Sequence, residues 1–255
     1  MNKEDESSFS TVEETDKFLT DFFVRGSNLK RCLSITEQKT LNLRNAYEHL
    51  LAKVKRDEKS SDYGLVAVSL LKETHRLLME GIEIPEGKTK PGMFSDLPRT
   101  TEYKGEKYEY QNPDDMERAV WNLFDQCNTM FEHCVKDGLQ DSDDLYYLFK
   151  TCAWLVFELL DLHPFSDGNG RLCRILCSYM LSKFTPFPTP VYNVWTNSCK
   201  DDYKDALVAA RKSKNRHPCA LTTMIIECSY QGWKKFKDAI KEKTNQDKSA
   251  PFRKV

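Results

Sequence analysis

The chain has 255 residues, enough for one large domain or two small ones with an ample core. Its 38 basic and 39 acidic residues leave a formal net charge of −1, which gives no electrostatic reason to expect nucleic acid or a membrane as the main partner. The nine cysteines are an odd number and lack the regular short spacing of a disulfide framework or a zinc ribbon.

No secretory leader and no membrane-spanning segment are expected from the sequence. The N-terminus is polar and acidic, and the longest apolar stretch is interrupted by Lys150, Glu158 and Asp161. We therefore expect a protein of the reducing cytoplasm or the nucleus.

Apolar residues at helical spacing occur from end to end of the chain. The pattern predicts a mainly α fold, with helices over 16–24, 36–56, 63–80, 113–136, 142–162, 170–184, 200–213 and 217–240. The chain then divides into a flexible N-terminus, N-terminal helices, a central core and a flexible tail, at 1–15, 16–80, 81–240 and 241–255.

Residues 90–112 are the exception to the helical pattern. Their prolines argue against a helix, and Lys104-Gly105 separates two short segments with alternating tyrosines, Tyr103, Tyr108 and Tyr110. We predict a small β-hairpin in this region.

The boundary between two predicted helices carries the chemistry. Leu145–Leu162 is almost wholly apolar and predicts a buried helix. Pro164 disfavours helical backbone in the residue before it, and Gly168 and Gly170 permit a tight loop. A second helix then begins near Gly170.

The residues of this loop suit a phosphate site. His163 is the one group here able to accept a proton near neutral pH. Asp167 offers a carboxylate of the kind that Mg²⁺ prefers. The backbone N–H groups of Gly168, Asn169 and Gly170 lie at a helix N-terminus, which favours an anion. Together these groups indicate attack of a hydroxyl on a phosphoryl centre.

Two arginines extend this site along the second helix. Arg171 and Arg174 are three residues apart, so they share a helix face and can both reach a bound polyphosphate. Each of these residues, taken singly, also has an ordinary structural explanation. Their occurrence together, in this strict order, favours function. A metal site at Cys127, His133 and Cys134 is disfavoured, because no second spaced pair accompanies them.

The twelve residues from His163 to Arg174 resemble the signature of the Fic family, His-Pro-Phe-x-Asp/Glu-Gly-Asn-Gly-Arg-x-x-Arg, at every defined position. The related phosphorylating branch, Doc, usually has Lys at the position of Gly170. The resemblance implies a Fic-type helical bundle with a hairpin flap. It also implies transfer of AMP from ATP to a Ser, Thr or Tyr hydroxyl of a protein, with Mg²⁺ bound and pyrophosphate leaving.

Roles follow by position from this resemblance. His163 is the general base, Asp167 is the Mg²⁺ ligand, and residues 168–170 form the anion hole. Arg171 and Arg174 bind the β- and γ-phosphates.

Two further regions resemble parts of the family less specifically. The hairpin falls where Fic proteins carry a flap that docks the target by strand addition, and we assign Thr101, Glu102 and Tyr103 to it. The alternative is a hairpin that only covers the core. Tyr203 resembles a tyrosine near the adenine site, with a core aromatic as the alternative, and Arg211 stands where eukaryotic members often have Asn.

A regulatory segment is also suggested. Many Fic proteins contain an inhibitory helix with Ser/Thr-x-x-x-Glu-Gly/Asn, often continuing as Glu-Gly-Asn-Thr-Leu-Thr-Leu. Residues 33–43 resemble this sequence at Glu37, Thr40, Leu41 and Leu43. They depart from it at Leu33, Gln38 and Lys39. The resemblance makes Glu37 an inhibitory partner of an arginine, and the alternative is a first-turn glutamate favoured by the helix dipole.

The resemblance thus leads to an Mg²⁺- and ATP-dependent protein adenylyltransferase, autoinhibited by Glu37. Other donors (UTP, GTP or CDP-choline) and removal of AMP remain open. A non-catalytic nucleotide-binding regulatory module is the alternative of another class, against which the retained His163 argues. The expected partners are ATP and a protein with a hydroxyl side chain, without nucleic acid or membrane, and a homodimer is compatible with the sequence.

Overall fold

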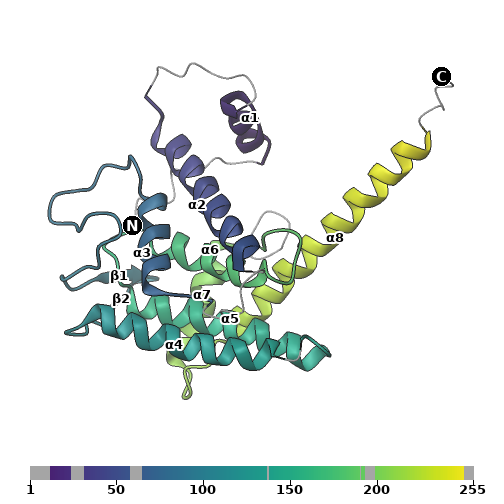
Figure 1. Ribbon diagram of the computed structural model, residues 1–255. Coiled ribbons are helices and arrows are strands. Elements are labelled where there is room, and N and C mark those ends of the chain that lie inside the picture. The colour runs from purple at the N-terminus through teal and green to yellow at the C-terminus, as the bar shows by residue number, and fades with distance from the viewer. Residues whose placement is uncertain are drawn as a thin grey trace.

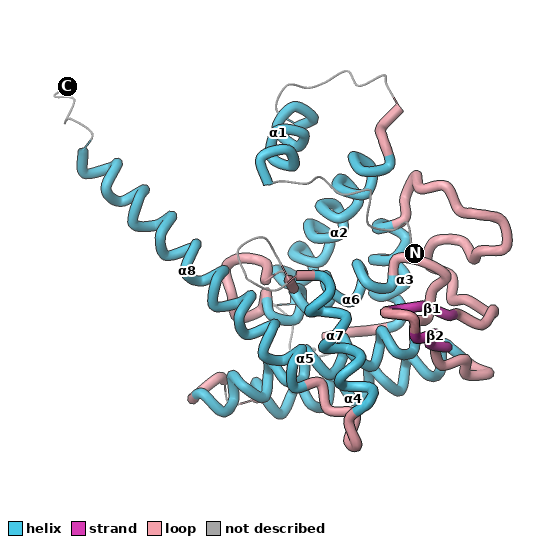
Figure 2. Tube along the Cα trace, turned by 180° about the vertical axis from the view of Figure 1, so that it is seen from behind, coloured by secondary structure: helices cyan, strands magenta, loops and turns pink. Residues whose placement is uncertain are grey.

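The computed structural model describes residues 12–23, 32–57, 65–136, 138–189, 191–192 and 199–249. Within these ranges the chain forms eight helices and one two-stranded antiparallel sheet (Figure 1). Figure 2, from behind, shows the hairpin at one side of the helical body and the last helix projecting away from it. The predicted mainly α fold with a small hairpin is therefore confirmed.

Helix α5 (Ser142–Leu162) is the centre of the fold. The Asp141 side chain caps it by accepting hydrogen bonds from the backbone N–H groups of Asp143 and Asp144. Three other helices pack against it: α4 (Met116–Val135), α6 (Asn169–Leu181) and α8 (Cys219–Ser249). Because neighbours cover α5 on several sides, its sequence is apolar almost all round, as expected for a buried helix.

The start of helix α3 (Val68–Leu78) is set by a side chain from another helix. The predicted helix over 63–80 begins too early, although 63 and 64 lie outside the described residues. The amide of Asn128, in α4, accepts the Val66 N–H at 3.0 Å and donates to the Val66 carbonyl at 2.9 Å. Since these bonds occupy both backbone groups of Val66, the chain before Val68 stays outside the helix.

The end of α3 is set in the same way. Asn42, on helix α2 (Ile35–Asp57), donates to the carbonyls of Leu78 at 3.1 Å and Glu80 at 2.7 Å. The last carbonyls of a helix have no intrahelical partner, so an amide donor stabilises a helix that stops here. Helix α2 packs on both α3 and α6, and α1 (Val12–Phe23) packs on α2.

Most of the other helices begin and end close to the predicted residues, but α1 and α8 do not. Helix α1 begins at Val12, so residues 12–15, predicted to belong to a flexible N-terminus, are helical. Helix α8 continues to Ser249, past the predicted end at 240, where we had expected an irregular tail from Lys241. The segment is polar but contains no Gly or Pro between Trp233 and Ser249, and Lys, Glu and Gln have high helix propensity. The polar residues after 240 lack the apolar spacing that predicts a packed helix, but they still form a helix.

The hairpin follows the prediction closely. Strand β1 (Thr100–Tyr103) pairs antiparallel with β2 (Glu106–Glu109), with Thr101 opposite Tyr108. The turn residues Lys104 and Gly105 both have positive φ, +50° and +79°, as a two-residue hairpin turn requires.

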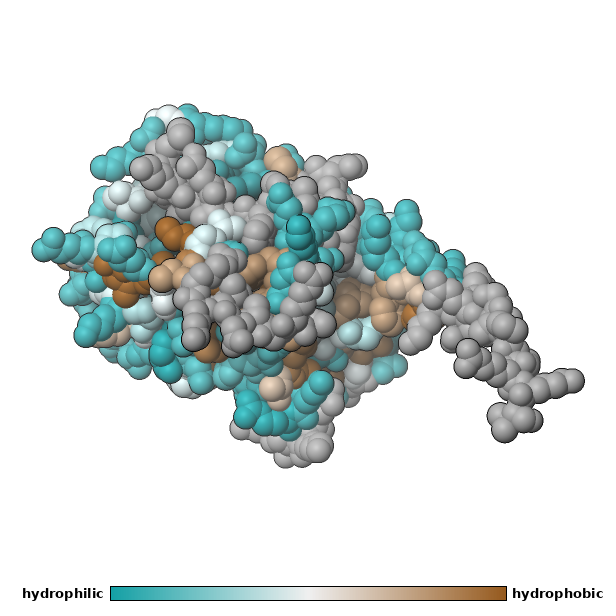
Figure 3. All heavy atoms as spheres, turned by 90° about the horizontal axis from the view of Figure 1, so that it is seen from above, coloured by the Kyte–Doolittle hydropathy of each residue, from teal (hydrophilic) through white to brown (hydrophobic). Residues whose placement is uncertain are grey.

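The described surface gives no sign of a membrane span. No helix within the described ranges is long and apolar enough to cross a bilayer. Seen from above, the surface that can be assigned is mostly hydrophilic, with hydrophobic groups in smaller areas between (Figure 3). Cys127 and Cys134, considered above as metal ligands, are buried in the core.

Candidate active site

A short loop between α5 and α6 brings the predicted site residues together. Helix α5 is followed by His163, whose backbone is left-handed (φ +50°, ψ +57°) and whose N–H donates to the Leu159 carbonyl at 3.0 Å. Helix α6 begins at Asn169, and Gly168 is its N-cap residue, with φ +78°. Residues 163–168 therefore span the whole connection between the two helices.

The Asn169 side chain holds this loop closed. Its Oδ1 accepts the Phe165 N–H at 3.0 Å, and its Nδ2 donates to the Phe165 carbonyl at 2.7 Å. Asn169 is only 2% exposed, so leaving these groups unpaired would be costly. Asn169 Oδ1 and one Nδ2 hydrogen are thus used in closing the loop.

Two glycines lie at the start of α6. A Cβ atom on Gly168 would lie 3.1 Å from Met79 Sδ and 3.3 Å from His75 Nε2, at a φ that disfavours other residues. A Cβ atom on Gly170 would lie 3.4 Å from Arg174 Nη1. Because Gly168 has no side chain to cap α6, the N–H groups of the first turn suit a bound anion.

His75, on α3, is a site residue that the sequence analysis missed. Its Nδ1 accepts the Gly92 N–H at 2.8 Å, so Nε2 carries the hydrogen and donates to the Asp167 carbonyl at 3.0 Å. Its ring stacks on Phe165, with centroids 3.7 Å apart. Burial lowers the pKa of His75 to about 4, in keeping with a neutral ring that braces the backbone of the half-buried Asp167. The available signal was a histidine inside a predicted helix.

The His163 imidazole is neutral and has a defined tautomer. Its Nδ1 lies 3.3 Å from the Leu160 carbonyl, which can only accept, so Nδ1 carries the hydrogen and Nε2 keeps its lone pair. The Tyr110 ring stacks on it, with centroids 3.8 Å apart and planes 12° apart. Burial lowers the pKa of His163 from 6.5 to about 4, partly opposed by the Leu160 hydrogen bond. Nε2 can therefore accept a proton at neutral pH.

The two arginines turn to different neighbours. Arg171 donates to the Leu78 carbonyl at 3.3 Å and to Met79 Sδ at 3.2 Å, at the end of α3. The Arg174 guanidinium lies 4.8 Å from the centre of the Tyr192 ring and 5.9 Å from that of Tyr203. Arg171 and Arg174 share one face of α6. To bind one ligand at the start of this helix, each side chain would have to leave these contacts or reach the ligand while keeping them.

Tyr203 lies in helix α7 (Lys200–Lys212) beside Arg174. The residue is 4% exposed, and within the described part of the chain its hydroxyl has no hydrogen-bond partner. Burial raises the pKa of this hydroxyl well above its ordinary value. A buried hydroxyl without a protein partner is suited to a bound polar group.

A family model described as the Fic/DOC family matches residues 65–181. This segment therefore resembles a Fic domain. A Fido domain-containing protein of Dictyostelium discoideum is 32% identical over 91 residues, 34% of this chain and 60% of that protein. The ribonucleoside-diphosphate reductase small chain of Ostreid herpesvirus 1 is 31% identical over 134 residues, 50% of this chain but 21% of that protein. The chain thus spans less than two thirds of either relative.

Solved Fic structures share the fold. A Fic family protein from Desulfovibrio desulfuricans G20 superposes with a TM-score of 0.59 at 18% identity, covering 95% of this chain and 62% of that one. IbpAFic2, solved covalently tethered to Cdc42, superposes with a TM-score of 0.50 at 13% identity, covering 86% and 62% of the chains. Fic domain proteins are generally transferases that pass a nucleoside monophosphate to proteins.

Glu37 lies outside the matched Fic domain, in the first turn of α2. Its carboxylate accepts the Ser34 N–H at 2.9 Å, and Ser34 Oγ accepts the Glu37 N–H at 3.2 Å. These reciprocal bonds form a capping box. Glu37 therefore has a structural task at the start of α2, which was the alternative considered from the sequence.

The hairpin is attached to α7. Thr101, Glu102 and Tyr103, which the sequence assigned to a flap, all lie in β1. Three polar contacts join the hairpin to the helix: Tyr103 Oη to the Asp201 carbonyl (3.3 Å), Lys104 Nζ to Asp205 (2.8 Å) and Lys212 Nζ to Glu106 (2.8 Å). All three are exposed, so none ties the hairpin strongly.

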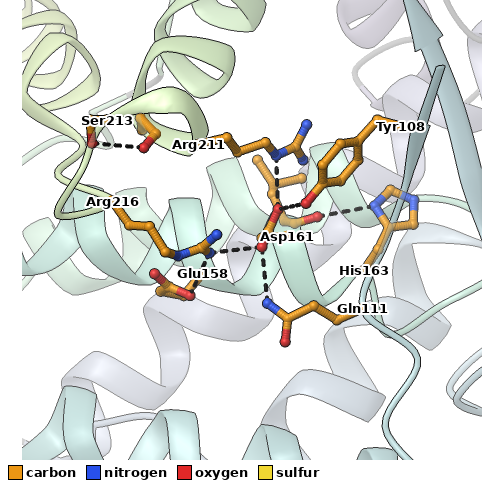
Figure 4. A network of polar contacts seen from close by, with 10 residues as sticks. Tyr108, Gln111, Glu158, Asp161, His163, Arg211, Ser213 and Arg216 are labelled. Atoms are coloured by element: carbon orange, nitrogen blue, oxygen red, sulfur yellow. Dashed lines mark hydrogen bonds and ion pairs between the residues drawn. The ribbon is translucent and has the colours of Figure 1, made fainter. Parts of the chain in front are cut away.

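A buried polar network lies under the hairpin, centred on Asp161 near the end of α5 (Figure 4). Asp161 is 1% exposed. Four side chains donate to its carboxylate: Tyr108 and Arg211 (2.8 Å) to Oδ1, and Gln111 (2.9 Å) and Arg216 (2.7 Å) to Oδ2. The sequence analysis treated Asp161 only as an interruption of an apolar helix. A carboxylate two residues before the predicted base was the signal that it left unused.

Proposed function

We propose that this protein transfers AMP from ATP to a Ser, Thr or Tyr hydroxyl of another protein. The observation that carries the proposal is the neutral His163 ring, whose Nε2 keeps its lone pair in the loop that leads into the start of α6. A proton acceptor and an anion-binding helix terminus in one tight loop are what attack on a phosphoryl centre needs.

In the proposed reaction the target's hydroxyl oxygen attacks the α-phosphorus of ATP. The hydroxyl proton passes to His163 Nε2, an O–P bond forms to the target, and the bond from the α-phosphorus to the bridging oxygen breaks. Pyrophosphate leaves with that oxygen. The N–H groups of residues 168–170 would stabilise the negative charge on the transferred phosphate.

The chain's own residues fit a nucleotide. Gly170 leaves space at the start of α6, and Arg171 and Arg174 would bind the β- and γ-phosphates. The Tyr203 hydroxyl beside Arg174, which has no partner among the described residues, would hydrogen-bond the nucleoside. Arg211 is bound to Asp161, so it has no evident task in selecting the base.

Asp167 would hold Mg²⁺, which supplies charge neutralisation to the phosphates when bound. Its half-buried carboxylate next to the first turn of α6 is a suitable oxygen ligand. Replacing Asp167 by Asn should remove the dependence of ATP binding on Mg²⁺, measured by calorimetry with and without the ion. A variant that keeps that dependence and the normal transfer rate would take Asp167 out of the mechanism.

The donor is tested directly by mass. The purified protein is incubated with Mg²⁺ and, separately, ATP, UTP, GTP or CDP-choline, and its intact mass is measured, with His163→Ala as control. We expect an AMP increment from ATP that the control lacks. A UMP, GMP or phosphocholine increment would replace AMP in the proposal, and loss of AMP from a modified protein would indicate the reverse reaction. Binding of ATP without any transfer would favour the non-catalytic regulatory module.

We also propose autoinhibition by Glu37, through competition with the γ-phosphate for the donors of Arg174. Glu37→Gln removes the negative charge but keeps an acceptor for the capping box, whereas Glu37→Gly removes both. Autoinhibition predicts that both variants increase AMP transfer over wild type. A purely structural role predicts no gain from either, and about 1 kcal/mol of lost stability in the glycine variant alone, seen as a lower Tm.

A further inference from the structure

We propose that Asp161 is a positioning residue for the transfer reaction: its carboxylate fixes strand β2 and the segment after it, so that the Tyr110 ring stays stacked on His163. The proposal goes beyond the base and phosphate residues of the loop, and for its effect on rate it rests on the proposed function. Asp161 contacts neither His163 nor the start of α6, so it would act through the hairpin.

The Asp161 carboxylate is fully used. An ionised carboxylate offers about four acceptor positions, and four side-chain donors fill them. The donors come from four places: Tyr108 from β2, Gln111 from the segment after it, Arg211 from α7, and Arg216 from the loop after α7. The backbone carbonyl of Asp161 also accepts the Gln111 N–H, at 3.4 Å. One buried side chain of α5 therefore joins the hairpin to α7 and to the loop after it.

These bonds hold the segment that carries Tyr110, the residue whose ring covers the His163 ring. Tyr108 and Gln111, both held by Asp161, flank Tyr110 in the chain, and Tyr110 stacks on His163. The Arg211 guanidinium, oriented by Asp161, lies 3.7 Å from the centre of the Tyr108 ring and 5.5 Å from that of Tyr110. Figure 4 shows the Tyr108, Gln111, Arg211 and Arg216 side chains pointing toward the Asp161 carboxylate, with His163 beside the group.

Removing the charge of Asp161 would disturb this arrangement in two ways. Arg211 would lose its carboxylate partner, and Arg216 would keep only Glu158, at 3.2 Å. Tyr108 and Gln111 would lose their shared acceptor, leaving the hairpin to its exposed contacts with α7 and to the bonds that Arg99 makes after β2. A side chain that misplaces a reacting group by about 1 Å can cost 10²-fold in rate.

The experiment compares Asp161→Asn with Glu158→Gln. Both changes neutralise a carboxylate of α5 that binds Arg216, but only Asp161 bonds the hairpin and Arg211. Nucleotide-free readouts come first: hydrogen exchange of residues 106–111 and NMR titration of the His163 ring in ¹³C-histidine-labelled protein. We expect Asp161→Asn to speed exchange and to shift the pKa of His163, because the stacked Tyr110 ring loosens and Arg211 loses its counter-charge. Glu158→Gln should leave both unchanged.

Transfer kinetics then test the consequence. Asp161→Asn should lower kcat by about 10- to 100-fold with little change in KM for ATP, since the phosphate contacts lie in the loop and α6. If Asp161→Asn does not fold, Tyr108→Phe removes one of the four donors and should change all readouts in the same direction by less. A folded Asp161→Asn with wild-type exchange and wild-type His163 titration would overturn the proposal. A wild type that transfers nothing would instead refute the proposed function, leaving the nucleotide-free result to decide this inference.

Discussion

The loop at 163–168 carries His163, and the hairpin at 100–109 leads into Tyr110, which stacks on the His163 ring; the loop and the hairpin are held in place differently. The loop is closed on itself by bonds between residues close in sequence, such as Asn169 to Phe165, and His75 then joins it to α3. The hairpin is held by residues far along the chain, such as Tyr108 to Asp161. The closure of the loop therefore follows from its own sequence, whereas the position of the hairpin depends on the packed fold. His163 and the hairpin that positions Tyr110 over it can therefore be altered separately.

Changing the base alone should give the largest effect. His163→Ala removes the proton acceptor but leaves the Asn169 bonds and the start of α6 in place. Transfer should fall by about 10²–10⁴-fold. ATP binding, measured by calorimetry, should stay close to wild type, because phosphate affinity belongs to the backbone N–H groups and the arginines. Loss of ATP binding by a folded variant would make His163 a ligand contact instead of the base.

The pH dependence of transfer tests whether the stacked Tyr110 ring shields His163 from water. Because burial lowers the pKa of His163 to about 4, folded protein keeps the ring neutral where unfolded chain, near 6.5, already binds a proton. The contribution of His163 to stability is thus complete above pH 6.5 and is lost as the pH falls to about 4. Transfer should likewise lose its base only near pH 4. An acid limb near pH 6.5 in the pH–rate profile would show that the hairpin does not shield the ring in solution.

The same contrast explains how much could be predicted from the sequence. The helix–loop–helix around His163 and the hairpin turn at Lys104-Gly105 are encoded by local patterns, and both were predicted. The limits of α3 were not, because they depend on amides of α2 and α4. The partners of Asp161 lie 50 to 55 residues away in the chain, and no local periodicity reports such pairs.

Breaking the local closure of the loop should cost the most stability. Asn169→Ala leaves the Phe165 N–H and carbonyl without partners in a buried position, at a cost of about 2–4 kcal/mol. Asn169→Asp keeps the acceptor and loses the donor, so it should lie between the alanine variant and wild type. Denaturant unfolding measures both. An alanine variant as stable as wild type would mean that the loop is held by bonds other than these.

His75 offers a smaller test, since it joins the loop to α3 and to the segment before the hairpin. His75→Phe keeps a flat ring against Phe165 but loses the bonds to Gly92 and Asp167, which should cost about 1–3 kcal/mol. The same substitution at the exposed His133 is the control and should change little. Equal unfolding midpoints for the two variants would remove His75 from the support of the loop.

The smallest effect is expected at the outer attachment of the hairpin, and it isolates the role of burial. Asp205→Asn makes the same chemical change as Asp161→Asn, and each aspartate binds the hairpin, but Asp205 pairs with Lys104 at the exposed surface. Water and salt weaken such pairs, so Tm should not change measurably. Any faster exchange of β1 and β2 in this variant at low salt should disappear at about 0.15 M salt, where charges are screened over about 8 Å. If Asp205→Asn speeded exchange of the hairpin as much as Asp161→Asn does, burial of the Asp161 carboxylate would not strengthen its hold on the hairpin. The hairpin would then be positioned by its surface pairs.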